Sequence, residues 1–275
     1  MKIKVGFFDR ILFKDFLYIL SASGVFFSFF SIIIDVSEKA KLFVGIALII
    51  ILFIIYFVMW RAANKLTSLE LSIDNSKVIV KLGNLFEEQG FKVIAFNEYF
   101  DTIVDNEIIS QNTLNGFYLN NIISNVEELD TLIEQNESLR EKVADINENR
   151  VRGKKKRYKL GTIFRNDDFL LTAFSRFDDN NRAFLNMNDY IGLLLNFWNE
   201  IDIIYAGKSV VLPLMGSGIT RFKEYNNITD QELLELLLWS FKISRIKFTY
   251  PSTVTIIIHQ ARKDKINFYK LRGVI

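Results

Sequence analysis

The sequence predicts an α/β protein, with an N-terminal two-helix transmembrane hairpin followed by a three-layer α/β/α domain on a mixed sheet. Two uncharged apolar runs open the chain, at residues 16–34 and 42–60. Beyond them, strand-like and helix-like segments alternate almost to the C-terminus, which is typical of α/β domains. We therefore expect a hairpin over residues 1–65 and a second domain over residues 66–275.

Both apolar runs are long enough to cross the roughly 30 Å core of a bilayer as helices. The run 42–60 is apolar on every face, whereas a helix buried in a soluble core rarely is over such a length. The run 16–34 contains several serines, so a cleaved signal peptide is the competing interpretation. A signal peptide would be shorter and would end in a small-residue cleavage site, and no such site precedes Asp35. Two spans are therefore predicted.

The charges that flank the spans predict their orientation. More positive residues lie before the first span and after the second span than in the short loop 35–41 that joins the two spans. They are Lys2, Lys4, Arg10 and Lys14 before the first span, and Arg61 and Lys65 after the second. Because Lys and Arg favour the cytoplasmic side of a membrane, we expect the N-terminus and the second domain to face the cytoplasm.

The first span carries small and hydroxyl-bearing residues along one helical face. They are Ser21, Gly24, Ser28 and Ser31. Membrane helices associate through such residues, because these allow close backbone approach and interhelical hydrogen bonds. Two arrangements are open. First spans from several protomers meet through this stripe in a homo-oligomer, or the stripe packs within one hairpin against Gly45 and Ala47.

Composition argues against several chemistries. The chain has no cysteine and a single histidine, His259. Disulfides and thiolate metal sites are thus excluded, and a zinc site or a Ser-His-Asp triad is not expected. His259 follows an apolar strand pattern, which is typical of a structural residue. We expect no metal and no cofactor, and the net charge of +2 gives no reason to expect a nucleic-acid partner.

The first strands of the second domain are recognisable by their patterning. Residues 68–73 and 77–82 alternate polar and apolar side chains on either side of a turn. Residues 91–96 form a continuous apolar run, as expected of a strand buried on both faces. A helix over 125–146 follows, with Asn125 as its N-cap and acidic residues in its first turn.

The rest of the domain continues the alternation. Residues 169–174 form a predicted strand, 189–205 a helix with apolar residues on one face, and 209–215 a strand that ends in a glycine loop. Thr229 and Glu232 form a capping box that opens another helix. The last predicted strands are 254–258 and 266–269.

The glycine loop is the motif that carries chemistry. It is formed by Gly216, Ser217 and Gly218, directly after a buried strand. Glycine permits positive φ and close approach, so such a loop can aim successive backbone N–H groups at an anion. Ligands of open α/β sheets bind beyond the carboxyl ends of the strands, where this loop would lie. The spacing alone fits both a phosphate loop and a plain turn.

Several segments together make residues 82–275 resemble a macro domain, the α/β module that binds ADP-ribose. Residues 81–86 resemble the strand-end motif whose acid meets the adenine amino group, with Asn84 in place of that acid. Residues 93–97 resemble the strand that ends in a ribose-side asparagine. Residues 110–116 fall where the first phosphate loop belongs, and 216–222 match the second. The resemblance implies these ligand-binding residues: Asn84, Leu85, Asn97, Ser110, Thr113, Asn115, Gly116, Gly216, Ser217, Gly218, Ile219, Thr220 and Arg221.

A membrane hairpin joined to this divergent macro domain is similar to the membrane effectors of type II Thoeris anti-phage systems. The closer match rests on residues 158–162, 173–178, Asn181 and 212–218. The resemblance implies a homo-oligomer in the bacterial inner membrane that senses a histidine conjugate of ADP-ribose. A TIR-domain partner enzyme would make this signal from NAD. The effector would then disrupt the host membrane and cause abortive infection.

Two other functions remain open, a membrane-anchored ADP-ribosyl hydrolase and a passive anchor for ADP-ribosylated partners. Hydrolytic macro domains usually carry a run of glycines in the first phosphate loop, and this chain has only Gly116 there. Asp178 is a candidate acid, but an aspartate after a strand is more often structural. General acid–base catalysis needs a positioned pair of groups, and the sequence reveals none. We therefore expect binding without turnover.

Residues 150–159 contain seven basic residues. Two interpretations of this run are open. It is a solvated loop after the preceding helix, or it contacts anionic lipid head groups, which attract such clusters near the cytoplasmic leaflet. Nucleic acid is less favoured, because the run lacks interleaved stacking aromatics and a recognisable module.

Overall fold

The computed structural model describes residues 3–33, 37–218, 220–223, 225, 227–249 and 251–274, without the side chains of residues 30–33 and 38. The chain divides into two compact units. One unit comprises Met1–Leu69 with Ile266–Val274, and the other comprises Glu70–Lys265. The C-terminal segment thus groups with the N-terminal helices, whereas the sequence-based division at residue 65 assigns it to the second domain.

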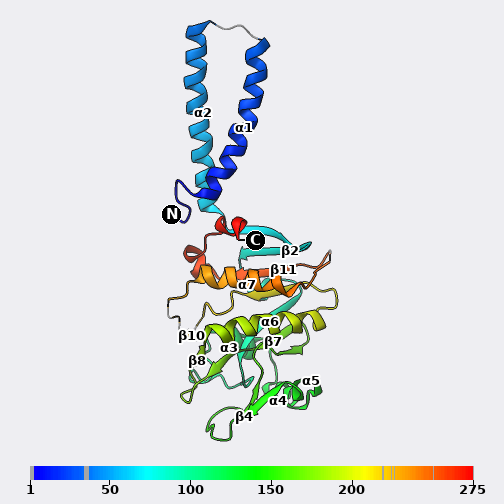
Figure 1. The fold of residues 1–275 in the computed structure, drawn as a ribbon. Helices are drawn as coiled ribbons and strands as arrows, with labels where there is room; N and C mark the ends of the chain where they lie inside the picture. Colours follow the sequence, from blue (N-terminus) through cyan, green and yellow to red (C-terminus); the bar gives the residue numbers. More distant parts are fainter. Residues whose placement is uncertain are drawn as a thin grey trace. The chain divides into compact units, whose positions relative to one another are not determined.

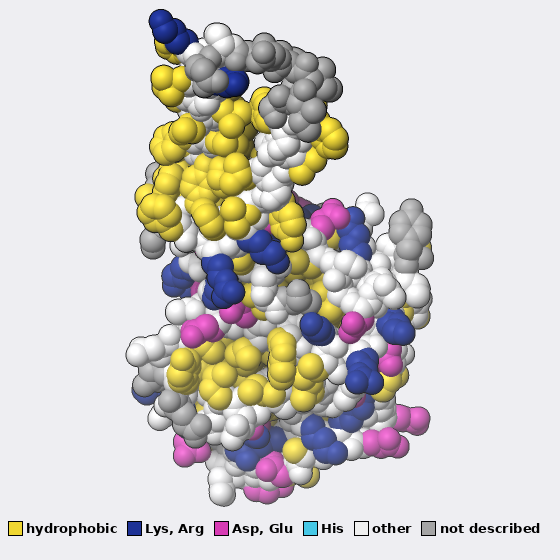
Figure 2. Space-filling model, turned by 45° about the horizontal axis from the view of Figure 1, so that its top comes forward, with side chains coloured by type: hydrophobic (Ala, Val, Ile, Leu, Met, Phe, Trp, Pro, Cys, Tyr) yellow, Lys and Arg dark blue, Asp and Glu magenta, His cyan; other side chains and the backbone are white. Residues whose placement is uncertain are grey.

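Two long helices dominate the first unit. Helices α1 (Arg10–Ile33) and α2 (Glu38–Lys65) lie side by side and antiparallel (Figure 1). Both are long and apolar enough to cross a membrane, and in each candidate span only 6% of the most apolar window is buried within the protein. Figure 2 shows many hydrophobic side chains gathered on the surface of these helices. Large contiguous apolar surfaces mark sites of contact with a membrane or a partner.

Hydrogen bonds tie the chain ends of this unit to the base of the hairpin. The Asn64 side-chain oxygen accepts from the N–H groups of Lys4 (2.7 Å) and Val5 (2.9 Å). Asp15 on α1 accepts from the Tyr269 hydroxyl at 2.6 Å and from Arg272 at 3.0 Å. The predicted strand over 266–269 is therefore wrong. This segment instead leads into a short 3₁₀ helix, η3 (Lys270–Gly273), and its polar side chains anchor it to α1.

The second unit is built on a mixed sheet, which has nine strands among the residues that the structure describes. Their order is β1-β2-β11-β9-β3-β7-β8-β10, with β6 pairing on β7. The strands are β1 (Ser68–Ile73), β2 (Ser76–Leu82), β3 (Phe91–Asn97), β6 (Ile163–Asn166), β7 (Phe169–Phe177), β8 (Ala183–Leu185), β9 (Val210–Pro213), β10 (Arg221–Phe222) and β11 (Val254–Ile258). The central strands β2, β11, β9, β3 and β7 are parallel, whereas β6 and β8 run antiparallel to β7. Every residue of β11 is buried, as its continuous apolar sequence predicts.

Helices pack on this sheet in two groups. The first group is α3 (Leu114–Asn121), α4 (Val126–Gln135) and α5 (Glu137–Arg140). It shares a core cluster with Ile94 and Phe96 of β3. The second group is α6 (Met187–Ile204) and α7 (Asp230–Ser244), which pack together where Trp198 donates to the Ser240 hydroxyl at 2.9 Å. The α/β/α fold class is confirmed, and the predicted capping box of Thr229 and Glu232 is present.

The single helix predicted over 125–146 is wrong in its second half. Asn125 caps α4 as expected, but the helix ends at Gln135 and Asn136 caps a new turn, α5, by accepting from Leu139 N–H at 2.9 Å. The chain then forms a two-stranded hairpin of β4 (Val143–Ile146) and β5 (Lys156–Tyr158). An asparagine side chain competes for backbone donors, so it favours a cap over a helix interior.

Candidate ligand-binding site

The carboxyl ends of parallel strands meet at one edge of the sheet. Strands β2, β3, β7 and β9 end at Leu82, Asn97, Phe177 and Pro213. Segments that the sequence assigns to ligand binding follow three of these strands, after β2, β3 and β9. Because open α/β sheets bind ligands at this edge, the topology brings the predicted segments to the place where a site is expected.

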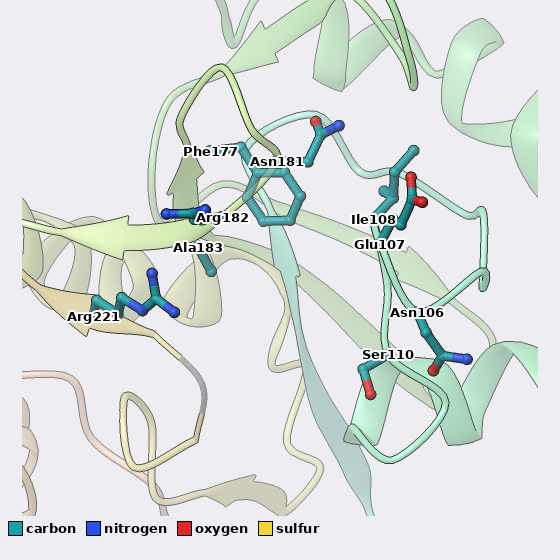
Figure 3. Close-up of a pocket in the computed structure, with 9 residues that line it drawn as sticks. All are labelled: Asn106, Glu107, Ile108, Ser110, Phe177, Asn181, Arg182, Ala183 and Arg221. Carbon is teal, nitrogen blue, oxygen red and sulfur yellow. The ribbon is translucent and has the colours of Figure 1, made fainter.

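A cavity of about 160 Å³ opens at this edge, between the loop after β3, the β7–β8 connection and Arg221 (Figure 3). Its lining residues are Asn106, Glu107, Ile108, Ser110, Phe177, Asn181, Arg182, Ala183 and Arg221. The Arg221 guanidinium enters from one side, Ser110 and Asn106 lie across the opening, and the Phe177 ring lies above them in this view, beside Asn181 (Figure 3). Pockets for drug-sized ligands occupy roughly 300–1,000 Å³. The cavity therefore has room for part of a nucleotide rather than all of it.

The first wall of the cavity is a tightly hydrogen-bonded loop before α3. Asp105 accepts from the N–H groups of Glu107 (2.9 Å) and Ile108 (2.7 Å). Partial burial raises the pKa of Asp105, but these two hydrogen bonds and the Arg152 charge outweigh it and hold the pKa below its ordinary value. The loop is thus stabilised by an ionised carboxylate at neutral pH.

The end of this loop contains most of the residues predicted for the first phosphate loop. Thr113 caps α3 by accepting from Gly116 N–H at 3.2 Å, and the Asn115 side chain accepts from the same N–H at 3.1 Å. A Cβ at Gly116 would lie 2.2 Å from the Ser110 carbonyl oxygen, so only glycine fits. Thr113, Asn115 and Gly116 therefore shape the loop, and of the predicted residues here only Ser110 lines the cavity.

Asn97 lies in a buried network. It is 3% exposed, and its amide nitrogen donates to Asp101 at 2.9 Å. Its oxygen accepts from the N–H groups of Tyr99 (3.0 Å) and Asp101 (3.2 Å). These bonds fix the turn after β3, and they use the side-chain groups that the resemblance assigns to a ribose. Asn97 does not line the cavity.

Asn84 and Leu85 also have structural partners. The Asn84 side chain caps the short 3₁₀ helix η1 (Leu85–Glu87), accepting from Phe86 N–H at 3.2 Å and donating to Glu87 at 2.9 Å. Leu85 is 2% exposed and belongs to the core. Neither residue lines the cavity.

The glycine loop after β9 rests on a buried aromatic platform. Gly216 has φ +86°, and a Cβ there would lie 3.2 Å from the Phe222 ring, so the position requires glycine. The buried Tyr190 hydroxyl donates to the Met215 carbonyl at 3.1 Å, and burial raises the pKa of Tyr190. The Ser217 hydroxyl donates to the Leu214 carbonyl at 2.8 Å. These contacts therefore fix the inner side of the loop against the buried side chains of Tyr190 and Phe222.

The outer part of the same loop faces open space. A Cβ built on Gly218 meets no heavy atom within 4 Å. Thr220 is half-buried, and Ile219 lies outside the described residues. Of the residues predicted in this loop, the structure places Arg221 in the cavity wall.

The cavity holds uncompensated positive charge. Within the described part of the chain, neither Arg182 nor Arg221 has an ion-pair partner, whereas other arginines nearby are paired, such as Arg150 with Asp101. Glu107 is the acid in the wall, and it pairs with Arg152. Arginine suits phosphate, because its planar guanidinium can donate two parallel hydrogen bonds. The arrangement favours an anionic ligand.

Two acids near the cavity have structural partners. Asp178 closes a turn by accepting from the N–H groups of Asn180 and Arg182, both at 2.9 Å. Glu98 is 3% exposed, and it accepts from Phe177 N–H at 3.2 Å and from Arg176 at 3.3 Å. Burial raises the pKa of Glu98 despite these bonds. Among the residues described, no cluster of three potential ligands could hold a metal ion.

Of the residues that line the cavity, the sequence analysis named Ser110 and Arg221 as ligand-binding residues and missed the others. Asn106 and Phe177 carry no motif of their own. A positive φ of 65° at Asn106 reflects a loop conformation that asparagine tolerates. Spacing in the sequence does not reveal such a conformation.

Comparisons with known proteins agree with this geometry. Residues 78–259 match the family model described as Thoeris protein ThsA, Macro domain. The fold and the site therefore define a macro domain. Thoeris protein ThsA of Bacillus amyloliquefaciens (strain Y2) is 44% identical over 233 residues, which cover 83% of this chain and 76% of that protein. The chain belongs to the Thoeris ThsA family.

Solved structures with a similar fold include macrodomains of Oceanobacillus iheyensis. A variant of that macrodomain aligns with a TM-score of 0.49 and 13% identity, covering 76% of this chain and 98% of that one. The same macrodomain with ADP aligns with a TM-score of 0.47 and 13% identity, covering 75% of this chain and 96% of that one.

Proposed function

We propose that this protein is an anti-phage defence effector that binds an ADP-ribose-derived signal and then disrupts the host membrane. The observation that carries the proposal is the placement of Ser110 and Arg221 on opposite sides of one cavity. These residues come from the two segments that resemble the phosphate loops of macro domains, and they are far apart in the sequence.

The chemistry of the cavity supports a nucleotide diphosphate. Arg221 and Arg182 supply positive charge to the cavity. The space beside Gly218 would allow a phosphate of the ligand to approach the backbone of the loop. The Phe177 ring adds an apolar surface to the lining of the cavity. An anion held by arginine and by backbone N–H groups gains charge-assisted hydrogen bonds, which are roughly twice as strong as neutral ones.

The signal would come from a partner enzyme. Membership in the Thoeris ThsA family supports a role beside a TIR-domain enzyme that converts NAD into a histidine conjugate of ADP-ribose. The two proteins would be linked through this small molecule and need not touch.

The apolar hairpin would be the part that acts on the membrane. The length and the exposed apolar surface of α1 and α2 support two spans, and the flanking positive charges support a cytoplasmic macro domain at the bacterial inner membrane. Binding would rearrange a homo-oligomer, and the hairpins would then permeabilise or deform the bilayer.

Calorimetry on the full-length protein in nanodiscs tests the binding step. We expect ADP-ribose or its histidine conjugate to bind the parent protein. We expect Arg221→Gln to weaken binding about tenfold or more, the scale of one hydrogen bond to a charged group. Arg140→Gln is the matched control, because Arg140 is an exposed residue of α5 that does not line the cavity. Equal affinities in all three proteins would refute the site.

A membrane-anchored hydrolase is the alternative, and the buried Glu98 beside the cavity wall is the residue that would favour it. Under the proposal, ADP-ribosylated substrates and the histidine conjugate stay intact when incubated with the protein. Multiple turnovers that disappear in Glu98→Gln would favour the hydrolase instead.

A further inference from the structure

The basic run 150–159 forms the loop and second strand of the β4–β5 hairpin, and most of its charges are paired inside the protein. The ion pairs are Arg150 with Asp101, Arg152 with Asp105 and Glu107, Lys154 with Asp130, Lys155 with Glu148, Lys156 with Glu134, and Arg157 with Glu98 and Asp145. The run is thus an ordered part of the hairpin, and ion pairs compensate most of its positive charge within the described residues.

The first arginine of the run reaches one wall of the cavity. Arg150 makes two hydrogen bonds to Asp101, at 2.7 and 3.1 Å, and its side chain is 6% exposed. The same guanidinium donates to Asn181 at 2.8 Å and lies 3.8 Å from the centroid of the Tyr99 ring. Asn181 lines the cavity, so Arg150 holds that wall to the buried turn after β3.

The second arginine of the run reaches another segment of the cavity wall. Arg152 pairs with Asp105 at 2.6 Å and also with Glu107. Glu107 lines the cavity, and Asp105 precedes Asn106, which also lines it. The loop residue between the two arginines is Val151, so both parts of the wall are attached to one short segment of the hairpin.

We propose that Arg150 and Arg152 form a strap that sets the spacing of these two parts of the cavity wall, and that they are positioning residues for ligand binding. This inference rests on the proposed function, because it assigns the strap to the proposed ligand pocket. Arg152 also neutralises Glu107, which would otherwise repel an anionic ligand from the cavity.

The strap explains a second feature of the loop. Gly153 has φ +90°, and a Cβ there would lie 2.7 Å from both the Arg150 guanidinium and an Asp101 oxygen. A side chain at this position would collide with the ion pair. Lys154 continues the attachment, since its N–H donates to Asp101 at 2.7 Å and its ammonium donates to the Phe100 carbonyl at 2.7 Å.

Arg152→Gln is the variant that tests the strap, because Arg152 is half-exposed and its loss leaves the buried Arg150 pair in place. Lys155→Gln is the matched control. It removes the same charge from the same loop, but Lys155 pairs with Glu148, which does not line the cavity. Both variants are made in the full-length protein in nanodiscs.

The first readout needs no ligand. Hydrogen exchange of the amides in residues 105–110 should rise roughly two- to tenfold in Arg152→Gln, the scale of two exposed ion pairs, and should not rise in Lys155→Gln. Equal exchange in the two variants would overturn the strap, whether or not the protein binds ADP-ribose.

The second readout is calorimetry with ADP-ribose. The affinity should fall by a similar factor in Arg152→Gln and recover in part in Arg152→Lys, which restores the charge. Raised exchange with unchanged affinity would overturn the role of the strap in binding. A parent protein that binds no ADP-ribose or histidine conjugate would overturn the proposed function, while the exchange measurement would still decide whether the strap holds the wall.

Discussion

At the scale of single residues, two glycines of the predicted phosphate loops should respond differently to substitution. Gly116 lies in a tightly packed position, whereas Gly218 faces open space. A Cβ at Gly116 would lie 2.2 Å from a carbonyl oxygen, whereas a Cβ at Gly218 meets nothing within 4 Å. Gly116→Ala should therefore lower the free energy of unfolding by about 1–3 kcal/mol, the usual cost of overpacking. Chemical denaturation measures this effect. Gly218→Ala is the control, and an equal loss in both variants would contradict the argument.

A larger side chain at Gly218 should act on binding alone. Valine there has room in the ligand-free protein, but its methyl groups would occupy the space through which a diphosphate reaches the loop backbone. We expect Gly218→Val to keep the unfolding midpoint and to lose at least about tenfold in affinity for ADP-ribose, the scale of a lost charge-assisted hydrogen bond. Unchanged affinity in calorimetry would remove this loop from the site.

Glu98 should make the free energy of unfolding depend on pH. Burial raises its pKa above the ordinary value of 4.5. A carboxyl group with a raised folded-state pKa contributes stability that is fully present below the unfolded-state value and is lost as the pH rises through the folded-state value. The stability of the parent relative to Glu98→Gln should therefore fall as the pH rises above 4.5. Unfolding curves from about pH 4 to pH 7 measure it, and a rising difference would contradict the assignment.

The site residues show what a sequence can predict at this scale. Arg221 and Ser110 belong to segments with recognisable spacing, so their meeting in one cavity could be anticipated. The partners of Asn97 could not be predicted, because they lie on Asp101 and on a turn that a strand motif does not specify. The lining residue Phe177 comes from a strand that reads as ordinary core.

At the scale of elements, long periodic segments were predictable and short ones were not. The strands β3 and β11 follow from their apolar runs, and α7 from its capping box. The β4–β5 hairpin was missed, because its strands are short and its stability comes from ion pairs with distant residues. The segment 266–269 has a strand-like pattern, but hydrogen bonds to Asp15 on α1 decide its structure.

The buried ion pair of the hairpin should dominate the stability of that element. Asp101 is fully buried, and Arg150 is its charged partner at 2.7 Å. Arg150→Met would leave this carboxylate unpaired, and breaking a buried pair in this way costs about 3–5 kcal/mol. Lys156→Met removes an exposed pair and should cost at most about 1 kcal/mol. Similar unfolding free energies for the two variants would show that burial does not set the strength of the pair.

The small-residue stripe of α1 has room beside its glycine. Among the residues that the structure describes, none outside the glycine's own stretch of helix lies within 4 Å of a Cβ built at Gly24 or at Gly45. This space favours contact with other protomers over packing within one hairpin. The Ser28 hydroxyl donates to the Gly24 carbonyl at 2.8 Å, and Ser31 lies outside the described side chains. Gly24→Leu should block ligand-induced permeability and leave ADP-ribose affinity unchanged, because close helix approach needs small residues. Ala22→Leu is the matched control, since Ala22 is a small, exposed residue on another face of the same helix. Equal permeability in both variants would exclude the stripe as the surface through which protomers associate.

At the scale of the whole molecule, the protein joins a macro domain to a hairpin of two apolar helices. The family match covers residues 78–259, and the two candidate spans lie before it, within residues 10–65. The sequence predicted both parts, since hydropathy and strand alternation extend over many residues. What it could not predict is how binding acts on the hairpin, because that depends on differences in energy between assembled states.

Dye leakage from liposomes that contain the purified full-length protein tests the central claim most directly. The protein should leave the liposomes intact alone, and the histidine conjugate of ADP-ribose should release the dye. Arg221→Gln should need at least about tenfold more conjugate, in line with its weakened binding, and Arg140→Gln should behave like the parent. Leakage without the conjugate, or an equal response in Arg221→Gln, would contradict the account of a membrane effector controlled through this cavity.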